Sequence, residues 1–238
     1  MRKALRSIDA TDSRFDGMAR HPDMGMVHYA HFTLADLARY FPAEYHKVID
    51  YRSIAIVRDP VDRFYSALFQ RLREFRGYQQ SQITASVIEI EADAVIEMLR
   101  ASAQRLDLEY VHFNRQSDYI FNDEERIVTE VFALDRLADA STYIESVTGV
   151  RLDEAAPENR TLALKAGVFA PLIRTLRKPY AAIVPLRMRD GLRTRLTKFG
   201  LYGSVEKRKF HEPGGRTERF LGAHYAKDFE LYAFASRR

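Results

Sequence analysis

An apolar run, a polar turn and an amphipathic pattern follow one another in the first third of the chain. The run 53–57 contains β-branched residues, which predicts a strand covered on both faces. Asp59 and Pro60 come next and are typical of a helix N-cap and of the first helical position. Because its N-terminus is polar and lies beside Arg58, this helix is suited to a bound phosphate. Its apolar residues recur every three or four positions and therefore share one face: Val61, Phe64, Tyr65, Leu68, Leu72 and Phe75.

The same periodicities predict further elements. A capping box of Thr33 and Asp36 opens a helix that stops at Pro42, whereas 110–121 has no clean period and is expected to be irregular. Strands alternate with helices, which predicts an α/β fold with a mostly parallel sheet flanked by helices, and we expect 1–238 to form a single domain. The remaining expected elements are strands at 26–29 and 127–132 and helices at 2–7, 93–103, 134–147, 169–176, 181–198 and 220–232.

Composition narrows the functional classes. The chain has 238 residues, of which 46% are hydrophobic and 29% charged, as in an ordinary soluble globular protein. It contains no cysteine, which excludes disulfides, thiolate metal sites and a cysteine nucleophile and fits a reducing compartment. No apolar run approaches the length of about 18 residues that a membrane span needs, so we expect a cytoplasmic protein without a transmembrane segment. The net charge of +4 is too small to indicate nucleic-acid binding.

Several short motifs together resemble a known enzyme family. The sequence Ile-Val-Arg-Asp-Pro-Val-Asp-Arg-Phe-Tyr-Ser at 56–66 resembles the 3′-phosphate-binding motif of sulfotransferases that use 3′-phosphoadenosine 5′-phosphosulfate (PAPS). Weaker matches, in the order found in the family 2, carbohydrate-type enzymes, lie at 30–33, 112–119, 157–161 and 225–231. The resemblance implies a P-loop-like sulfotransferase fold. It also implies transfer of a sulfuryl group from PAPS to a hydroxyl-bearing acceptor such as a carbohydrate, without a metal.

The resemblance assigns roles to three residues. Arg58 and Ser66 match the residues that bind the 3′-phosphate, a dianion that a guanidinium fork and a short hydroxyl donor hold well. The alternative is that Arg58 pairs with Asp62 while Ser66 lies on a solvated face. His31 matches a histidine that is proposed in some relatives to deprotonate the acceptor hydroxyl, and imidazole suits this task. His28 is a rival base, and both histidines are also compatible with surface or capping roles.

Two further segments have a functional and a structural interpretation. Arg115 and Gln116 lie in the 112–119 motif, where they either contact substrate or pack the segment. Positive charge gathers from Arg187 to Lys209, which either attracts an acidic acceptor such as a polysaccharide or forms a solvated basic face.

The second cofactor-binding element of the family is missing from the expected place. Relatives carry a Pro-Lys-x-x-x-Thr-Ser-like loop after the first strand, which wraps the 5′-phosphosulfate as a P-loop wraps phosphates. No such loop precedes His28, and 2–6 resembles the helix that normally follows it. We therefore expect the N-terminal strand and loop to lie upstream. The alternatives are that another segment takes the place of the loop, or that the chain is a truncated or degenerate, non-catalytic relative that binds a nucleotide or an acidic glycan. The lack of a Gly-Lys-Ser/Thr loop disfavours a P-loop phosphotransferase.

Overall fold

The computed structural model describes residues 17–102, 105–150, 162–164, 202–204 and 214–237. The chain divides into two compact units, 1–155 with 207–238 and 156–206. The second unit is described through one antiparallel pair, β7 (Leu162–Leu164) and β8 (Tyr202–Ser204). Four predictions lie outside the described residues: the helices at 2–7, 169–176 and 181–198, and the motif at 157–161. The basic residues from Arg187 to Lys209 lie outside them as well.

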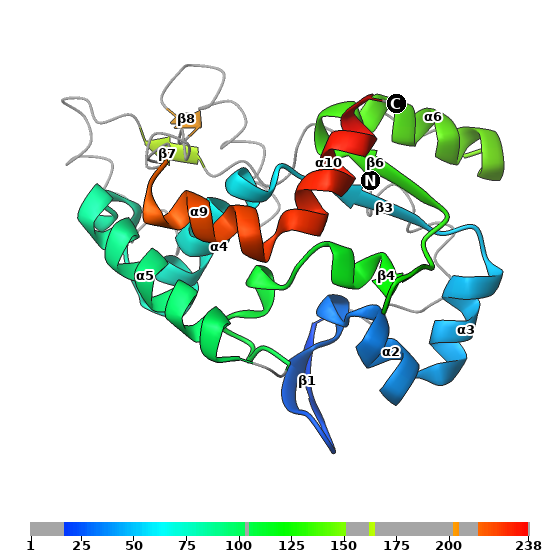
Figure 1. Cartoon of the computed structure of the whole chain (residues 1–238), viewed down its shortest axis with the longest axis horizontal. Helices are drawn as coiled ribbons and strands as arrows, with labels where there is room; N and C mark the ends of the chain where they lie inside the picture. The colour runs from blue at the N-terminus through cyan, green and yellow to red at the C-terminus, as the bar shows by residue number, and fades with distance from the viewer. Residues whose placement is uncertain (1–16, 103–104, 151–161, 165–201, 205–213, 238) are drawn as a thin grey trace, which may run out of the picture. The chain divides into compact units, whose positions relative to one another are not determined.

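The first unit combines helices with short strands (Figure 1). Its described residues form seven α-helices: α2 (Leu34–Tyr40), α3 (Pro42–Asp50), α4 (Pro60–Glu74), α5 (Ala85–Ala101), α6 (Leu137–Thr148), α9 (Arg216–His224) and α10 (Ala226–Arg237). The strands are β1 (Met18–His21), β2 (Gly25–His28), β3 (Ile54–Val57), β4 (Phe121–Asn122), β5 (Glu125–Arg126) and β6 (Glu130–Ala133). Short 3₁₀ turns are η2 (Tyr29–His31), η3 (Gln80–Gln82), η4 (Val111–Phe113), η5 (Ser117–Tyr119) and η6 (Leu134–Arg136).

The predicted α/β class is confirmed, with a smaller parallel sheet than expected. Among the described residues, β3 and β6 form the parallel pair, in register from Ile54 opposite Glu130 to Val57 opposite Ala133. The other pairs, β1–β2, β4–β5 and β7–β8, are antiparallel. The carboxyl ends of β3 and β6 therefore meet at one edge, where ligands bind in folds with parallel strands.

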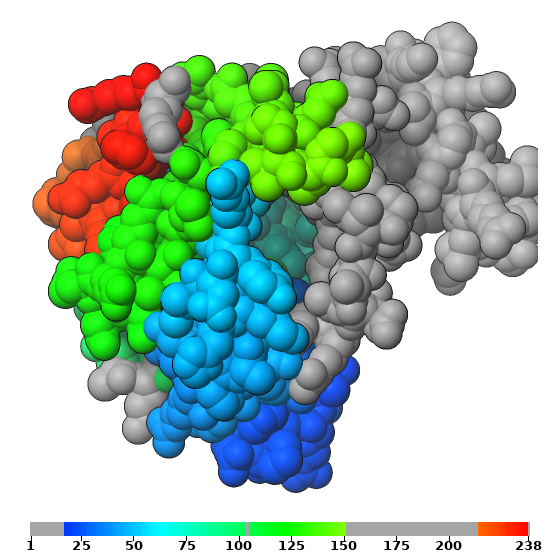
Figure 2. Space-filling view, turned by 90° about the vertical axis from the view of Figure 1, so that its right-hand side faces the viewer, coloured from blue at the N-terminus to red at the C-terminus, as the bar shows by residue number. Residues whose placement is uncertain are grey.

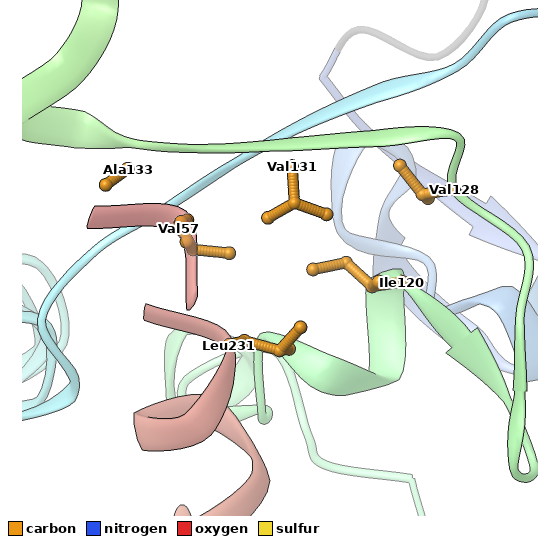
Figure 3. Packing of buried hydrophobic residues seen from close by; sticks show 7 residues of the cluster. Val57, Ile120, Val128, Val131, Ala133 and Leu231 are labelled. Atoms are coloured by element: carbon orange, nitrogen blue, oxygen red, sulfur yellow. The ribbon is translucent and has the colours of Figure 1, made fainter. Parts of the chain in front are cut away.

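Helix α10 covers one face of the parallel pair. Val57 of β3 and Val131 of β6 point from one face of the strand pair into a buried cluster that also contains Leu231 of α10 (Figure 3). Ile120 and Val128 close this cluster from the segment between η5 and β6. The core thus joins the strand that leads to Arg58 to the last helix of the chain.

The strand-turn-helix unit formed by β3 and α4 has the predicted form. Asp59 caps α4 by accepting a hydrogen bond from the Asp62 amide (3.0 Å), and Pro60 occupies the first turn. Of the predicted apolar face, Phe64, Tyr65, Leu68 and Leu72 are buried, whereas Phe75 at the C-cap is 41% exposed. Because α5 and α9 pack against further sides of α4, the helix also buries Ala67, Phe69 and Arg71.

Several boundaries differ from the predictions. The helix expected at 93–103 begins at Ala85, since Thr84 caps it through the Val87 amide. The final helix is two helices that meet at Tyr225. The strand expected at 127–132 starts at Glu130, because the amides of residues 127 and 128 both donate to the Ile120 carbonyl oxygen. The strand expected at 26–29 is β2, at 25–28.

The N-terminal helices follow their caps closely. Thr33 and Asp36 form the predicted capping box, and α2 ends before Pro42, which opens α3. No residue of α3 is buried, and Figure 2 shows this helix (light blue) on the surface between the segment of β1 and β2 (dark blue) and α6 (yellow-green). Among the described helices, none is long and apolar enough to cross a membrane.

Candidate functional site

One glutamine side chain holds the main chain at the carboxyl end of β3. The Arg58 amide donates to Gln116 Oε1 (2.8 Å), and Gln116 Nε2 donates to the Arg58 carbonyl oxygen (2.8 Å). Gln116 is 8% exposed, so water does not compete well for these bonds. The packing interpretation of Gln116 is thus the one that its contacts favour, and its partner is the candidate phosphate ligand.

Gln116 is held in turn by the last helix. Asp228 is fully buried, and its two carboxylate oxygens accept from the amides of Gln116 (2.7 Å) and Ser117 (2.8 Å). Tyr225 adds a third link by donating from its hydroxyl to the Phe113 carbonyl oxygen (2.7 Å). The motifs at 56–66, 112–119 and 225–231, which are far apart in the sequence, therefore meet at one point.

The Arg58 side chain is held differently from its main chain. It is half-buried, and it forms no hydrogen bond or ion pair with another described residue. Burial lowers the pKa of this guanidinium; the Asp62 charge opposes the shift, Arg63 adds to it, and Asp59 opposes it. The expected alternative, a direct ion pair with Asp62, is not formed, although the Asp62 charge acts on Arg58 from a distance.

The polar face of α4 lies next to Arg58. Arg63 and Ser66 are three residues apart, so they share one side of the helix, and both are half-buried. The N-terminus of α4 is less open than the sequence suggested, because the Asp59 carboxylate already accepts from the Asp62 amide. An anion at this site would therefore be bound by side chains more than by the end of the helix.

Three histidines from two segments pack together: His28 and His31 are close in the sequence, and His112 comes from η4. The ring centroid of His31 lies 4.6 Å from that of His28 and 4.6 Å from that of His112, both in edge-to-face contact. His28 has a local role, since its Nδ1 accepts from the Ala30 amide (3.3 Å) and caps η2. The Tyr119 hydroxyl donates to the His31 carbonyl oxygen (3.3 Å) and joins η2 to η5. Of the two rival bases, His31 is the one whose ring has no such capping role.

Burial and neighbouring positive charge lower the pKa of two of these imidazoles, His31 and His112. The pKa of His31 is lowered to about 4, mainly by burial and further by His112, His28 and Arg63. Burial also lowers the pKa of His112, with Glu74 opposing and Arg63 assisting. The charge of Arg63 lowers the pKa of Arg58, His31 and His112 alike, so it couples the candidate anion site to these two histidines.

Sequence reasoning did not select Arg63 or His112 as site residues. Both nevertheless lie in segments that resemble the sulfotransferase family, Arg63 in 56–66 and His112 in 112–119. Their importance comes from side chains that converge in space, which no local pattern reports.

Other features of the described residues offer weaker sites. A shallow depression lined by Glu130, Phe132, Arg136, Asp139, Tyr143 and Ala235 contains neither Arg58 nor His31. No group of three or more His, Cys, Asp or Glu side chains in the described part of the chain is arranged to hold a metal ion. The cluster around Arg58, Arg63 and His31 is therefore the candidate site, because it combines a cation that has no bonded partner among the described residues with shifted pKa values.

Comparisons with known proteins add no relative. No protein-family model matches the chain, and no curated protein or solved structure matches it either. The functional argument therefore depends on the residues of the site.

Proposed function

We propose that this chain is a PAPS-dependent sulfotransferase that moves a sulfuryl group to a hydroxyl-bearing acceptor such as a carbohydrate. The observation that carries the proposal is the half-buried Arg58 at the carboxyl end of a parallel strand, whose guanidinium has no bonded partner among the described residues. We further propose the P-loop-like sulfotransferase fold and a cytoplasmic location, which the cysteine-free sequence supports.

The residues present fit the 3′-phosphate of the donor. A partly buried cation is stabilised when a dianion binds, and the Arg58 guanidinium, which has no bonded partner among the described residues, can donate two parallel hydrogen bonds to a phosphate. Ser66, on the polar face of α4, would supply the hydroxyl donor. The structure offers no comparable reason to assign a described residue to the 5′-phosphosulfate.

His31 would accept the proton of the acceptor hydroxyl. With a pKa of about 4, its imidazole is neutral at pH 7 and able to accept a proton, although it is a weak base. A bound anion would raise this pKa, because negative charge favours the imidazolium and offsets Arg63 and His112. Arg63 would stabilise negative charge that develops between the two ends of the site. The donor supplies the transferable sulfuryl group.

Calorimetry tests the 3′-phosphate site directly. The two ligands are adenosine 3′,5′-bisphosphate and adenosine 5′-phosphate, which differ in the group assigned to Arg58. We expect the bisphosphate to bind more tightly by about tenfold or more, the value of a hydrogen bond to a charged group. Equal affinity for the two nucleotides, or binding of neither, would refute the proposal.

The low pKa of His31 also favours a second candidate, a non-catalytic protein that binds a nucleotide or an acidic glycan. A base that weak contributes less to proton transfer near neutral pH. The two candidates separate in a transfer assay with radiolabelled donor and a broad panel of hydroxyl acceptors. Labelled product that is lost in His31→Asn supports the enzyme, whereas nucleotide binding without product supports the binding protein.

A further inference from the structure

Two successive sets of hydrogen bonds connect the last helix of the chain to Arg58. The Asp228 carboxylate binds the amides of Gln116 and Ser117 at 2.7 and 2.8 Å. The Gln116 side chain then binds the amide and the carbonyl oxygen of Arg58, each at 2.8 Å. None of these contacts involves the Arg58 guanidinium, so they fix the position of the residue without neutralising its charge.

The burial of this chain of contacts makes it stiff. Asp228 is 0% exposed and Gln116 is 8% exposed, so neither can exchange its partners for water. A buried carboxylate without its two amide donors would be costly, which favours the geometry in which segment 116–117 lies against α10. With both of its polar main-chain groups bound by one side chain, Arg58 has a fixed Cα–Cβ direction at the end of β3.

We propose that Gln116 and Asp228 are positioning residues for the anion site, and that α10 thereby controls how Arg58 presents its guanidinium. This inference rests on the proposed function, since it takes the 3′-phosphate as the anion. Linkage makes the effect reciprocal: a ligand that binds the positioned Arg58 must also stabilise the contact of 116–117 with α10. Neither residue needs to touch the nucleotide.

The first test measures the preference for the 3′-phosphate, defined as the Kd of adenosine 5′-phosphate divided by that of adenosine 3′,5′-bisphosphate. Gln116→Met keeps the approximate shape but removes both bonds to Arg58, and we expect it to reduce the preference about tenfold. Asp228→Asn loses one amide bond, and we expect a reduction of about threefold. A role confined to stability would lower the unfolding temperature without changing the preference of the folded protein.

A matched control lies on the same helix. Glu230 is exposed and is two residues from Asp228, so Glu230→Gln makes the same chemical change outside the network. We expect its preference to equal that of the wild type. An unchanged preference in folded Gln116→Met would overturn the inference while leaving the proposed function intact. A wild type without any preference would overturn the proposed function itself.

Hydrogen exchange on the wild type keeps the inference testable if the variants do not fold. Saturating adenosine 3′,5′-bisphosphate should slow exchange of the amides of Arg58, Gln116 and Ser117 severalfold more than saturating adenosine 5′-phosphate does. Equal exchange rates at these three amides with the two nucleotides would overturn the inference, whatever the affinities are.

Discussion

Two arginines of the strand-turn-helix unit are placed in opposite ways. Arg71 of α4 is 1% exposed and forms ion pairs with Glu91 and Glu109, the second at 2.9 Å. It also donates to the Tyr110 hydroxyl (2.8 Å) and lies over the Tyr110 ring, 4.3 Å from the centroid. Arg58 is half-buried, and its guanidinium has no hydrogen-bond or ion-pair partner among the described residues.

The difference separates a structural cation from one that is available to a ligand. The charge of Arg71 is compensated inside the protein, where it joins α4 to α5 and to the segment before His112. At Arg58 the described residues bind the main chain and form no hydrogen bond or ion pair with the guanidinium. A partly buried guanidinium of this kind is the surrounding expected of a ligand-binding cation, which agrees with the proposed role of Arg58.

The largest expected effect is the loss of stability when Arg71, the arginine with ion-pair partners, is replaced. Arg71→Met leaves Glu91 as a buried carboxylate without its main partner and should lower the free energy of unfolding by about 3–5 kcal/mol. Arg73→Met, an exposed change on the same helix, should cost less than about 0.5 kcal/mol. Urea denaturation measures both. The contrast would be lost if Arg71→Met were as stable as Arg73→Met.

Arg58→Met should have the opposite effect, with a large loss of nucleotide affinity and little change in stability. The affinity for adenosine 3′,5′-bisphosphate should fall by about 10–100-fold, which corresponds to about 1.5–3 kcal/mol for hydrogen bonds to a charged group. Stability should change by less than about 0.5 kcal/mol, because no partner of the guanidinium within the described residues is left unpaired. Arg58→Lys keeps the charge without the fork and should bind with intermediate affinity. A large loss of stability with unchanged affinity would make Arg58 a second structural cation.

The local parts of this arrangement were predictable from the sequence. Asp59 and Pro60 defined the start of α4, and the capping box of Thr33 and Asp36 defined the start of α2. Gly149, with a φ of 68°, is the C-cap of α6, which ends at Thr148, one residue beyond the predicted end. Such signals act over three or four residues and need no tertiary contact.

The contrast between the arginines was not predictable, because it depends on long-range partners. Arg71 lies outside the predicted apolar face, and only Glu91 and Glu109 explain how a cation is buried there. Gln116 was assigned to a motif without its partner, since Arg58 is 58 positions away. Likewise, the low pKa of His31 requires His112, which reaches it from a different segment.

The pH dependence of stability tests the lowered pKa of His31 in the candidate site. The pKa of His31 is about 4 in the folded chain and near 6.5 in an unfolded one, so the unfolded state binds more protons between these values. Stability should therefore fall as the pH decreases from 6.5 towards 4. NMR titration of the ring should give the low pKa directly. His112→Asn should raise it while leaving it below 6.5, because burial is the larger cause. A His31 pKa near 6.5 in the wild type would contradict this picture.

The smallest expected effect comes from variants of Asp59, which separate its charge near Arg58 from its role as the N-cap of α4. Asp59 caps α4 through the Asp62 amide, and its charge also raises the pKa of the Arg58 guanidinium. Asn is as good an N-cap as Asp, so Asp59→Asn should change the free energy of unfolding by only a few tenths of a kcal/mol. Removing the negative charge should strengthen the binding of adenosine 3′,5′-bisphosphate by about two- to threefold, because a like charge near the bound phosphate is lost. Asp59→Ala, which removes both functions, should show the same gain in affinity together with a loss of about 1 kcal/mol in stability. Calorimetry and urea denaturation of the pair separate the two roles; weaker binding in Asp59→Asn would mean that Asp59 holds Arg58 in place and that its charge does not compete with the ligand.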